Sequence, residues 1–353
     1  MALLTIKNYI RNVAAAKLLG DRVALPIFAT YHVTSYCNLA CTYCEDYGLH
    51  KNKNRPDPWL QLADAKHVLR VIRTATENIV FTGGEPLLHK NIEELLAYAR
   101  EIGFRTVNMI TNAVLLPKKE GVLPHLTRLV ISLDSLDTKA WDKVLGINKP
   151  GTAARIIANI EHYAKLQDKY GYNIAINCVV TPATVSMVRD VIDFCERNKL
   201  SFSLSPQGVN DHPHEGLVKM PEYRALVADV LAMKQTGRNV LGSAAYLSHM
   251  LDFEEFQCYP TVNMRVMENG DFIYPCRPIA EMADGRGGVA CNLRSYDDFA
   301  DALRHAVEQY GQPPEGCQSC FQQCFAEPSL FIDKPLRMLP ELKSYMRSRK
   351  NVD

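Results

Sequence analysis

The segment Cys37-Asn-Leu-Ala-Cys41-Thr-Tyr-Cys44 places three thiols within one short loop. It directly follows an apolar run, Leu25–Val33, that is typical of a buried strand. Three thiolates from one loop can hold three corners of a 4Fe–4S cluster, whereas electron-transfer ferredoxins close the cluster with a fourth. The fourth iron would then be open to another ligand. The alternative is a zinc site, which needs four ligands and would take His32 or His50 as the fourth.

The composition narrows the class of protein. The chain has 353 residues, enough for one large α/β domain and a smaller one. Its 40 basic and 39 acidic residues balance, so the net charge gives no support for a nucleic-acid partner. No apolar run reaches the roughly 18–20 residues of a membrane span, and no secretory signal is visible. Eleven cysteines in such a chain indicate metal binding in the cytoplasm rather than disulfides.

Short apolar runs alternate with helical patterns between residues 25 and 205. The runs that we expect to be strands are Leu25–Val33, Ile79–Phe81, Thr106–Ile110, Arg128–Leu133, Asn173–Val180 and Leu200–Leu204. Amphipathic helical patterns lie between them, near 61–76, 91–102, 118–125, 137–168 and 184–198. The alternation predicts right-handed βαβ units and a parallel sheet. Six units fit an α/β fold of the partial (β/α)6 TIM-barrel type, and an open doubly wound sheet is the rival.

The segments outside these units set the expected domain boundaries. We expect an N-terminal amphipathic helix in 1–24, the barrel in 25–205, a helical linker in 206–256, a small cysteine-rich α+β extension in 257–330 and a basic tail in 331–353. In the first helix, Leu3, Ile6, Ile10 and Val13 recur at helical spacing, and all charges are basic. Such a helix either packs against the barrel or makes peripheral contact with an anionic membrane surface.

A second motif follows the second predicted strand, Thr82-Gly83-Gly84-Glu85-Pro86. Consecutive glycines let the backbone approach a ligand closely, and a carboxylate accepts hydrogen bonds from an ammonium group. With the Cys-x3-Cys-x2-Cys loop and its aromatic Tyr43, this motif resembles the radical S-adenosylmethionine (SAM) superfamily. The resemblance implies that Cys37, Cys41 and Cys44 bind a 4Fe–4S cluster and that SAM chelates the open iron. It also implies that Gly83, Gly84, Glu85 and Pro86 bind the amino group of SAM.

The same resemblance implies further SAM ligands at the ends of later strands. Asn112 closes the third predicted strand, and Ser132 and Asp134 close the fourth, two residues apart and thus on one face. In the family, polar residues here hold the carboxylate and ribose of SAM, with helix capping as the alternative for Ser132 and Asp134. Val180 and Ser205 match places where the family contacts adenine.

The resemblance implies an activity as well. A radical SAM enzyme cleaves SAM reductively, leaving methionine and a 5′-deoxyadenosyl radical that abstracts hydrogen from a substrate. The electron would come from a flavodoxin- or ferredoxin-type donor. The expected enzyme is an oxidoreductase, or one that forms or rearranges C–C or C–X bonds through radicals. The cofactor does the difficult chemistry and the protein positions it. The sequence identifies no catalytic acid or base beyond the cluster.

A second group of cysteines lies near the C-terminus. Two predicted strands, Val262–Met267 and Asp271–Tyr274, form a hairpin that turns at Asn269-Gly270. This region resembles the SPASM/twitch extensions of radical SAM enzymes, which bind auxiliary clusters. We expect one auxiliary 4Fe–4S cluster, held by Cys258, Cys276 and two of Cys317, Cys320 and Cys324. Four thiolates suit zinc equally well, so zinc is the alternative.

Two substrate classes and one other class of protein are open. Only 36 residues precede Cys37, which leaves no room for an N-terminal peptide-recognition domain. We therefore expect a small molecule, a sugar derivative or a lipid-like metabolite as the substrate. A peptide maturase that recruits its peptide through a separate protein is the alternative. A non-catalytic metal-binding scaffold would keep the barrel without any radical chemistry.

Overall fold

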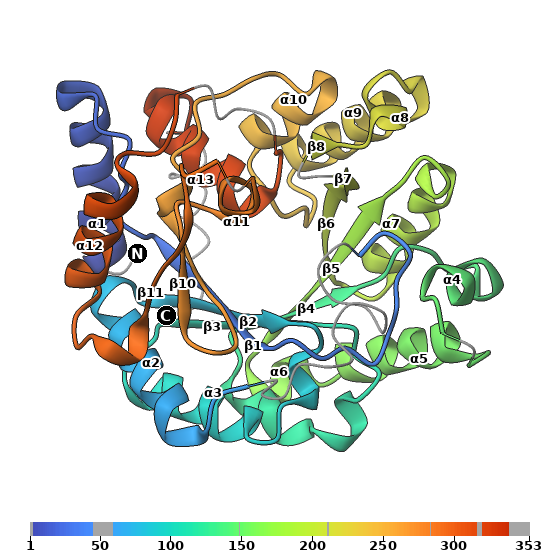
Figure 1. Ribbon diagram of the computed structural model, residues 1–353. Helices are drawn as coiled ribbons and strands as arrows, with labels where there is room; N and C mark the ends of the chain where they lie inside the picture. The colour runs from blue at the N-terminus through green and yellow to red at the C-terminus, as the bar shows by residue number, and fades with distance from the viewer. Residues whose placement is uncertain are drawn as a thin grey trace.

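The computed structural model describes residues 3–44, 59–147, 149–209, 212–282, 284–315 and 320–338. In this part of the chain, nine strands form one sheet in the order β11-β10-β9-β1-β2-β3-β4-β5-β6. The strands that pair in parallel in chain order are β1 Phe28–Thr34, β2 Asn78–Gly83, β3 Thr106–Thr111, β4 Arg128–Ser132, β5 Asn173–Val180 and β6 Ser201–Pro206. The sheet curves but does not close, because β6 and β11 are its two edges (Figure 1). The predicted partial barrel is confirmed.

Helices connect the parallel strands and cover the outside of the sheet (Figure 1). They are α2 Leu62–Ala75, α3 Ile92–Glu101, α4 Thr138–Val144, α5 Thr152–Ala164, α6 Gln167–Tyr170 and α7 Val188–Arg197. The helix predicted near 118–125 is instead two 3-10 segments, η3 Leu116–Lys118 and η4 Glu120–His125. Pro117 and Pro124 lie inside them, and proline removes a helical donor and favours such short turns.

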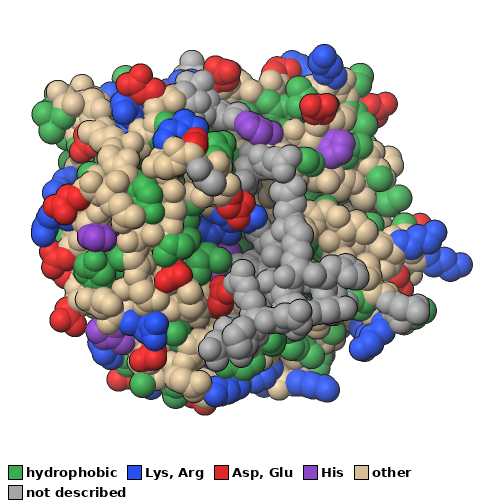
Figure 2. All heavy atoms as spheres, in the orientation of Figure 1, with side chains coloured by type: hydrophobic (Ala, Val, Ile, Leu, Met, Phe, Trp, Pro, Cys, Tyr) green, Lys and Arg blue, Asp and Glu red, His purple; other side chains and the backbone are tan. Residues whose placement is uncertain are grey.

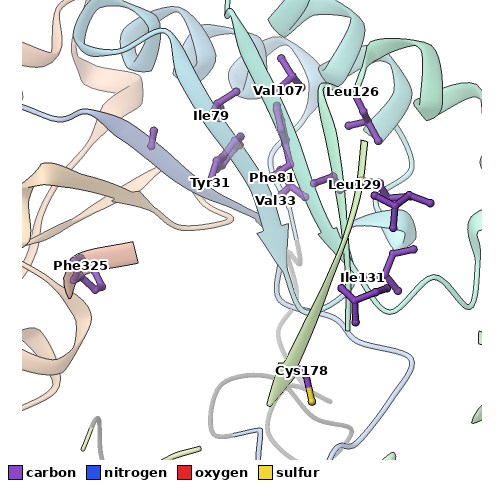
Figure 3. Packing of buried hydrophobic residues seen from close by; sticks show 14 of the residues in the cluster. Tyr31, Val33, Ile79, Phe81, Val107, Leu126, Leu129, Ile131, Cys178 and Phe325 are labelled. Atoms are coloured by element: carbon purple, nitrogen blue, oxygen red, sulfur yellow. The ribbon is translucent and has the colours of Figure 1, made fainter. Parts of the chain in front are cut away.

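The apolar core lies between the sheet and these helices. Figure 3 shows Ile79, Phe81, Val107, Leu129 and Ile131 among the residues that pack there. In β2, β3 and β4 these buried residues alternate with residues that are only partly buried. Alternate side chains of a strand point to opposite faces, so the second set faces the inside of the barrel. The inner face is therefore available for ligands rather than for packing.

The C-terminal extension belongs to the same sheet. β9 Asn263–Val266 pairs in parallel with β1, while β10 Asp271–Tyr274 and β11 Gly288–Asn292 follow in antiparallel order. The predicted hairpin is thus confirmed, and Gly270 adopts a positive φ of 89° in its turn. The sequence separated this extension from the barrel, but the strand pairing makes the two continuous.

The remaining helices follow β6 in the chain, and one of them, α12, packs against α2 on the outside of the sheet. They are α8 Glu215–Val218, α9 Pro221–Gln235, α10 Ala244–Asp252, α11 Arg277–Glu281, α12 Phe299–Tyr310 and α13 Gln323–Asp333, with the short 3-10 segments η2 Pro86–Leu88, η5 Val185–Met187, η6 Pro260–Val262, η7 Leu293–Ser295 and η8 Pro335–Met338. A small antiparallel pair, β7 Gly208–Val209 and β8 His212–Pro213, precedes α8. No described helix is long and apolar enough to cross a membrane.

The N-terminal helix, α1 Leu3–Ala14, continues as a π-helical turn, η1 Ala15–Leu19, and ends at Gly20 as the sequence predicts. Its buried positions differ from the prediction. Asn8 and Asn12 are buried against the body of the protein, whereas Ile10, expected on the packed face, is exposed. The asparagines are buried because they bond backbone carbonyls: Asn8 donates to Pro26 and Ala75, and Asn12 donates to Leu25.

Candidate active site

The three-cysteine loop begins where β1 ends and is tied to the end of α4. The amides of Ala40 and Thr42 donate to the carbonyls of Leu145 and Val144 at 3.0 and 2.9 Å. Gly146 follows with a positive φ of 65°, and a Cβ there would overlap the carbonyl oxygen of Ala40. The backbone of the loop is therefore positioned by a helix three strands away in the barrel.

The Gly83-Gly84 pair joins the second strand to the start of this loop. The amide of Gly84 donates to the carbonyl of Thr34 at 2.9 Å, and that of Glu85 donates to the carbonyl of Tyr36 at 2.7 Å. A Cβ on Gly83 would overlap the oxygen of Thr34, and one on Gly84 would overlap that of Tyr36. The sequence suggested that the glycines make room for a ligand. The structure shows that they make room for the backbone leading to Cys37.

Glu85 is completely buried and has several hydrogen-bond donors around its carboxylate. Oε1 accepts from the Thr111 hydroxyl at 2.6 Å and the Leu87 amide at 3.0 Å, and Oε2 accepts from the Asn112 amide at 2.8 Å. Burial raises the pKa of Glu85 to about 7, and these donors oppose the rise. Because a carboxylate offers about four acceptor positions, three fixed donors leave Oε2 room for one further donor.

Asp134 has a different role from the one that the sequence indicated. Its Oδ2 accepts from the Tyr43 hydroxyl at 2.6 Å, and its Oδ1 accepts from the Val179 amide at 2.8 Å. Burial raises the pKa of Asp134 to about 6. Its side chain does not line the cavity described below. It does not cap the next helix either, since Asp137 caps α4. Asp134 therefore fixes Tyr43, and through it the last turn of the loop, against β5.

One cavity of about 190 Å³ collects most of the predicted ligands. Its lining residues include Cys37, Cys41, Tyr43, Cys44, Gly83, Gly84, Glu85, Asn112 and Ser132. Thr82, which begins the second motif, also lines it, as do Trp141 and Leu145, which nothing in the sequence singled out. Asn112 is held by a hydrogen bond from its Nδ2 to Oδ1 of Asn38 at 2.8 Å. Pro86, the remaining residue of the second motif, is buried at the start of η2 outside the lining.

The thiols of this cavity suit a metal cluster. Burial raises the pKa of Cys37 to about 12 and that of Cys41 further in the same direction. A metal must displace these protons, because only thiolates act as ligands. In the described part of the chain, no three His, Cys, Asp or Glu side chains are grouped to hold a single metal ion. Three thiols around one cavity, with a free carboxylate position opposite, fit a cluster that offers an open iron.

A second cavity, of about 660 Å³, fills the inside of the barrel next to the first. Ile110 lines both. The second cavity is lined by Val80 of β2, Asn108 of β3 and Val130 of β4. Two positions later on the same strands, Thr82 and Ser132 line the first cavity and Ile110 lines both. The wall of each strand therefore runs from one cavity to the other. The two-residue alternation of these strands was the sequence signal for this chamber.

The two predicted adenine contacts lie near this second cavity. Ser205 lines it, and its hydroxyl donates to Oδ1 of Asn177 at 3.0 Å. Val180 is buried, and its carbonyl accepts from the Gln207 amide at 2.8 Å. The structure thus places Ser205 at the chamber rather than at the cavity of the thiols, and Val180 lines neither cavity.

The C-terminal cysteines are only partly brought together. Cys320 and Cys324 line the second cavity, and burial raises the pKa of Cys324 to about 11. Cys258 is buried, and the Ser329 hydroxyl on α13 lies 3.7 Å from its sulfur. Cys276 is buried at the start of α11. Cys317 lies outside the described residues, so the predicted auxiliary ligand set stays a prediction.

Comparisons with known proteins agree with this site. Residues 31–195 match the family described as the radical SAM superfamily. The probable GTP 3′,8-cyclase of Methanosarcina mazei is 31% identical over 167 residues, which are 44% of this chain and 43% of that protein. The probable GTP 3′,8-cyclase of Methanococcus maripaludis is 24% identical over 289 residues, covering 78% of this chain and 89% of that protein.

A solved structure shares the fold. Streptococcus suis SuiB bound to S-adenosylmethionine superposes with a TM-score of 0.62 and 22% identity, over 84% of this chain and 69% of that one. The fold is an α/β partial barrel, and three thiols and one buried carboxylate line a single cavity in it. Residues 31–195, slightly less than half of the chain, match the radical SAM superfamily, and this segment contains the three-cysteine loop and the Gly-Gly-Glu-Pro motif.

The glycine contact gives a first prediction. Gly84→Ala pushes a methyl group into the Tyr36 carbonyl, at a cost of about 1–3 kcal/mol of overpacking, and displaces the backbone leading to Cys37. We expect the folded variant to retain less iron, down to about half of the wild-type amount, after anaerobic reconstitution, measured by iron analysis, because only the cluster of the three-cysteine loop is affected. Gly208→Ala is the control, because its Cβ meets no atom closer than 3.8 Å. Equal iron in Gly84→Ala and the wild type would contradict this account.

Proposed function

We propose that this protein is a SAM-cleaving radical enzyme whose substrate occupies the 660 Å³ chamber. The observation that carries the proposal is the cavity shared by Cys37, Cys41, Cys44 and Glu85, which adjoins the chamber at Ile110. When bound, the cluster and SAM supply a one-electron reductive cleavage that yields methionine and a 5′-deoxyadenosyl radical. A flavodoxin- or ferredoxin-type protein is the proposed electron donor.

The protein residues bind and orient SAM. The free position on Oε2 of Glu85 accepts from the ammonium group of SAM, while Thr111, Asn112 and Leu87 keep the carboxylate fixed. Because these three donors already hold the Glu85 carboxylate, it does not have to change its orientation when SAM binds. Asn112 and Ser132, which line the same cavity, donate to the carboxylate and ribose. Ser205, farther along the inner wall, lies on the substrate side.

The chamber suits a small molecule with little charge. Its volume lies within the roughly 300–1,000 Å³ of small-molecule pockets. Among its described lining residues, Arg128 is the only cation and Glu327 the only carboxylate, and the others are apolar, hydroxyl, thiol or amide side chains. A nucleoside triphosphate carries several negative charges and needs more cations than this. We therefore propose a weakly charged substrate, and not the GTP that the names of the two cyclases indicate for those proteins.

The lining of the chamber is also evidence for an auxiliary cluster. Cys320 and Cys324 line it opposite the inner faces of the strands, and Cys324 lies beside Asn263 and Arg265 of β9. A cluster ligated by these thiols, with Cys258 and Cys276, would border the substrate. We propose one auxiliary 4Fe–4S cluster at this wall of the chamber.

SAM cleavage is the direct test of the activity. The anaerobically reconstituted protein, given reductant and SAM, should produce 5′-deoxyadenosine and methionine, measured by mass spectrometry. Cys41→Ala removes one of the three thiols and should lower the formation of both products by at least about a thousandfold. A substitution that only removes core packing lowers the free energy of unfolding by about 0.5–3 kcal/mol and should leave product formation largely intact. Cys195→Ala, on α7 and away from both cavities, should keep it. A wild-type protein with a full cluster that forms neither product would be a non-catalytic scaffold.

Iron counting tests the auxiliary cluster. A variant with Cys37, Cys41 and Cys44 all changed to alanine should keep about four irons per chain. Changing Cys324 to alanine in addition should remove them, because that thiol lines the chamber wall. Zinc in place of iron in the triple variant, measured by inductively coupled plasma spectrometry, would refute the cluster, and so would an absence of both metals.

The chamber predicts how substrates affect the rate. GTP should leave the rate of 5′-deoxyadenosine formation unchanged, while an organic-solvent extract of cell metabolites should raise it several-fold. Val130→Phe adds bulk to the chamber wall and should abolish the increase without changing the background cleavage of SAM. Leu231→Phe, on α9, is the control. Stimulation of the wild type by GTP would contradict the proposed substrate class.

A further inference from the structure

One corner of the molecule exposes large apolar side chains. Among the described residues, Leu18, Leu19 and Leu336 are the large hydrophobic side chains with the greatest exposure, at 80%, 79% and 79%. Ile10 follows at 60%, while the others reach at most 52%. Three of these four lie on α1 and η1. Isolated exposed leucines are common on proteins, but a group of this kind marks an interaction surface.

The exposed leucine of η8 belongs to the same corner. Tyr9 of α1 donates its hydroxyl to the carbonyl of Phe331 on α13 at 3.1 Å, and Lys17 of η1 pairs with Asp333 at 3.4 Å. Leu336 follows Asp333 by three residues. Figure 1 shows α1 along the side of the molecule, with α13 close to it. In Figure 2, hydrophobic side chains protrude at the upper left, over the far end of α1, near basic side chains.

The helix is oriented opposite to an ordinary packed helix. Its buried side carries Asn8 and Asn12, which bond the backbone carbonyls of Leu25, Pro26 and Ala75. Its exposed side carries Lys7, Ile10, Arg11, Ala14, Lys17 and Leu18, spaced as one helical face. A helix that served only to cover the barrel would bury its apolar residues and expose its polar ones. The asparagines hold the helix in place, and Ile10, Leu18 and Leu19 face outward.

The helix and its π-helical turn carry charges of one sign, while Asp333 of α13 lies beside them and pairs with Lys17. From Leu3 to Leu19 the chain has three basic residues, Lys7, Arg11 and Lys17, and no acidic residue. Lysine and arginine next to exposed leucines can extend their heads to phosphate groups while the apolar side chains enter the acyl boundary. An apolar protein partner would not require this basic frame, whereas an anionic lipid surface complements both parts of it.

We propose that the face formed by Lys7, Ile10, Arg11, Lys17, Leu18, Leu19 and Leu336 docks the protein on an anionic lipid bilayer. The apolar side chains enter the interface, and Lys7 and Arg11 bind headgroup phosphates, while Lys17 pairs with Asp333 at the edge of the face. The docked corner adjoins the chamber, because Phe331, whose carbonyl accepts from Tyr9, also lines the cavity with Ile27 and Phe28. The docking itself does not depend on the proposed chemistry.

Vesicle binding tests the docking. The full protein should co-sediment with mixed phosphatidylcholine and phosphatidylglycerol vesicles and much less with phosphatidylcholine vesicles alone, and added salt should weaken the binding. Leu18→Ser combined with Leu19→Ser should reduce binding by about tenfold or more, since the insertion depends on those side chains. Lys7→Glu combined with Arg11→Glu should remove the preference for the anionic vesicles.

A matched control separates this face from exposed hydrophobicity in general. Met282→Ser combined with Val289→Ser changes two side chains that are 52% and 51% exposed elsewhere, and should bind vesicles as the wild type does. Equal loss in this control, equal binding to both vesicle types, or no binding at all would overturn the proposal. A wild-type dimer that becomes a monomer on Leu18→Ser and Leu19→Ser, without vesicle binding, would show a self-interface and overturn it as well.

Discussion

The site depends on how closely the backbone after β2 approaches the backbone after β1. Two amides, from Gly84 and Glu85, bond the carbonyls of Thr34 and Tyr36, and no Cβ fits between the two segments. This contact sets the position of Cys37 relative to the Glu85 carboxylate, which three other donors hold in turn. The three-cysteine loop and the Glu85 carboxylate are therefore one rigid unit, although forty residues separate Cys44 from Glu85 in the chain. Preorganisation of this kind removes the cost of assembling a site around its ligand.

Alternate side chains of each strand serve different purposes: one set packs in the core, and the other lines the cavities inside the barrel. Outward side chains such as Phe81 and Ile131 pack under the helices, while inward ones bond to one another across neighbouring strands. Thr106 donates to Asn78 at 2.9 Å, Ser205 to Asn177 at 3.0 Å and Thr30 to Asn263 at 2.9 Å. Such a wall is ordered without being packed, because its polar groups satisfy each other. Its inner residues can differ between relatives with little effect on the core, which is how one fold accepts many substrates.

Sequence patterns predicted the barrel and most of the first cavity, because both depend on local signals. Strand–helix alternation, the thiol spacing and the Gly-Gly-Glu-Pro segment are all readable within short windows. The misassignments concern contacts between distant segments. Asp134 bonds Tyr43 and Val179, and nothing near it in the chain indicates either partner. Asn8 and Asn12 bond carbonyls of other segments, and the apolar periodicity of the first helix gave no sign that these two residues are buried. Pro117 and Pro124, which lie inside η3 and η4, were a local signal against an α-helix there, but the prediction followed the helical periodicity instead.

The pairing of β9 with β1 ties the C-terminal extension to the strand that carries the cysteine loop. Without β9, β1 would become an open sheet edge in the apolar centre of the protein, with unpaired amides and carbonyls ready to recruit another chain. The extension is thus a structural part of the barrel sheet and not a separately folded domain. A barrel truncated before residue 257 would lack β9, the neighbour of β1. We expect such a truncated protein to aggregate through the exposed edge of β1. The extension and the barrel therefore form one continuous sheet whose centre includes the strand before the three-cysteine loop.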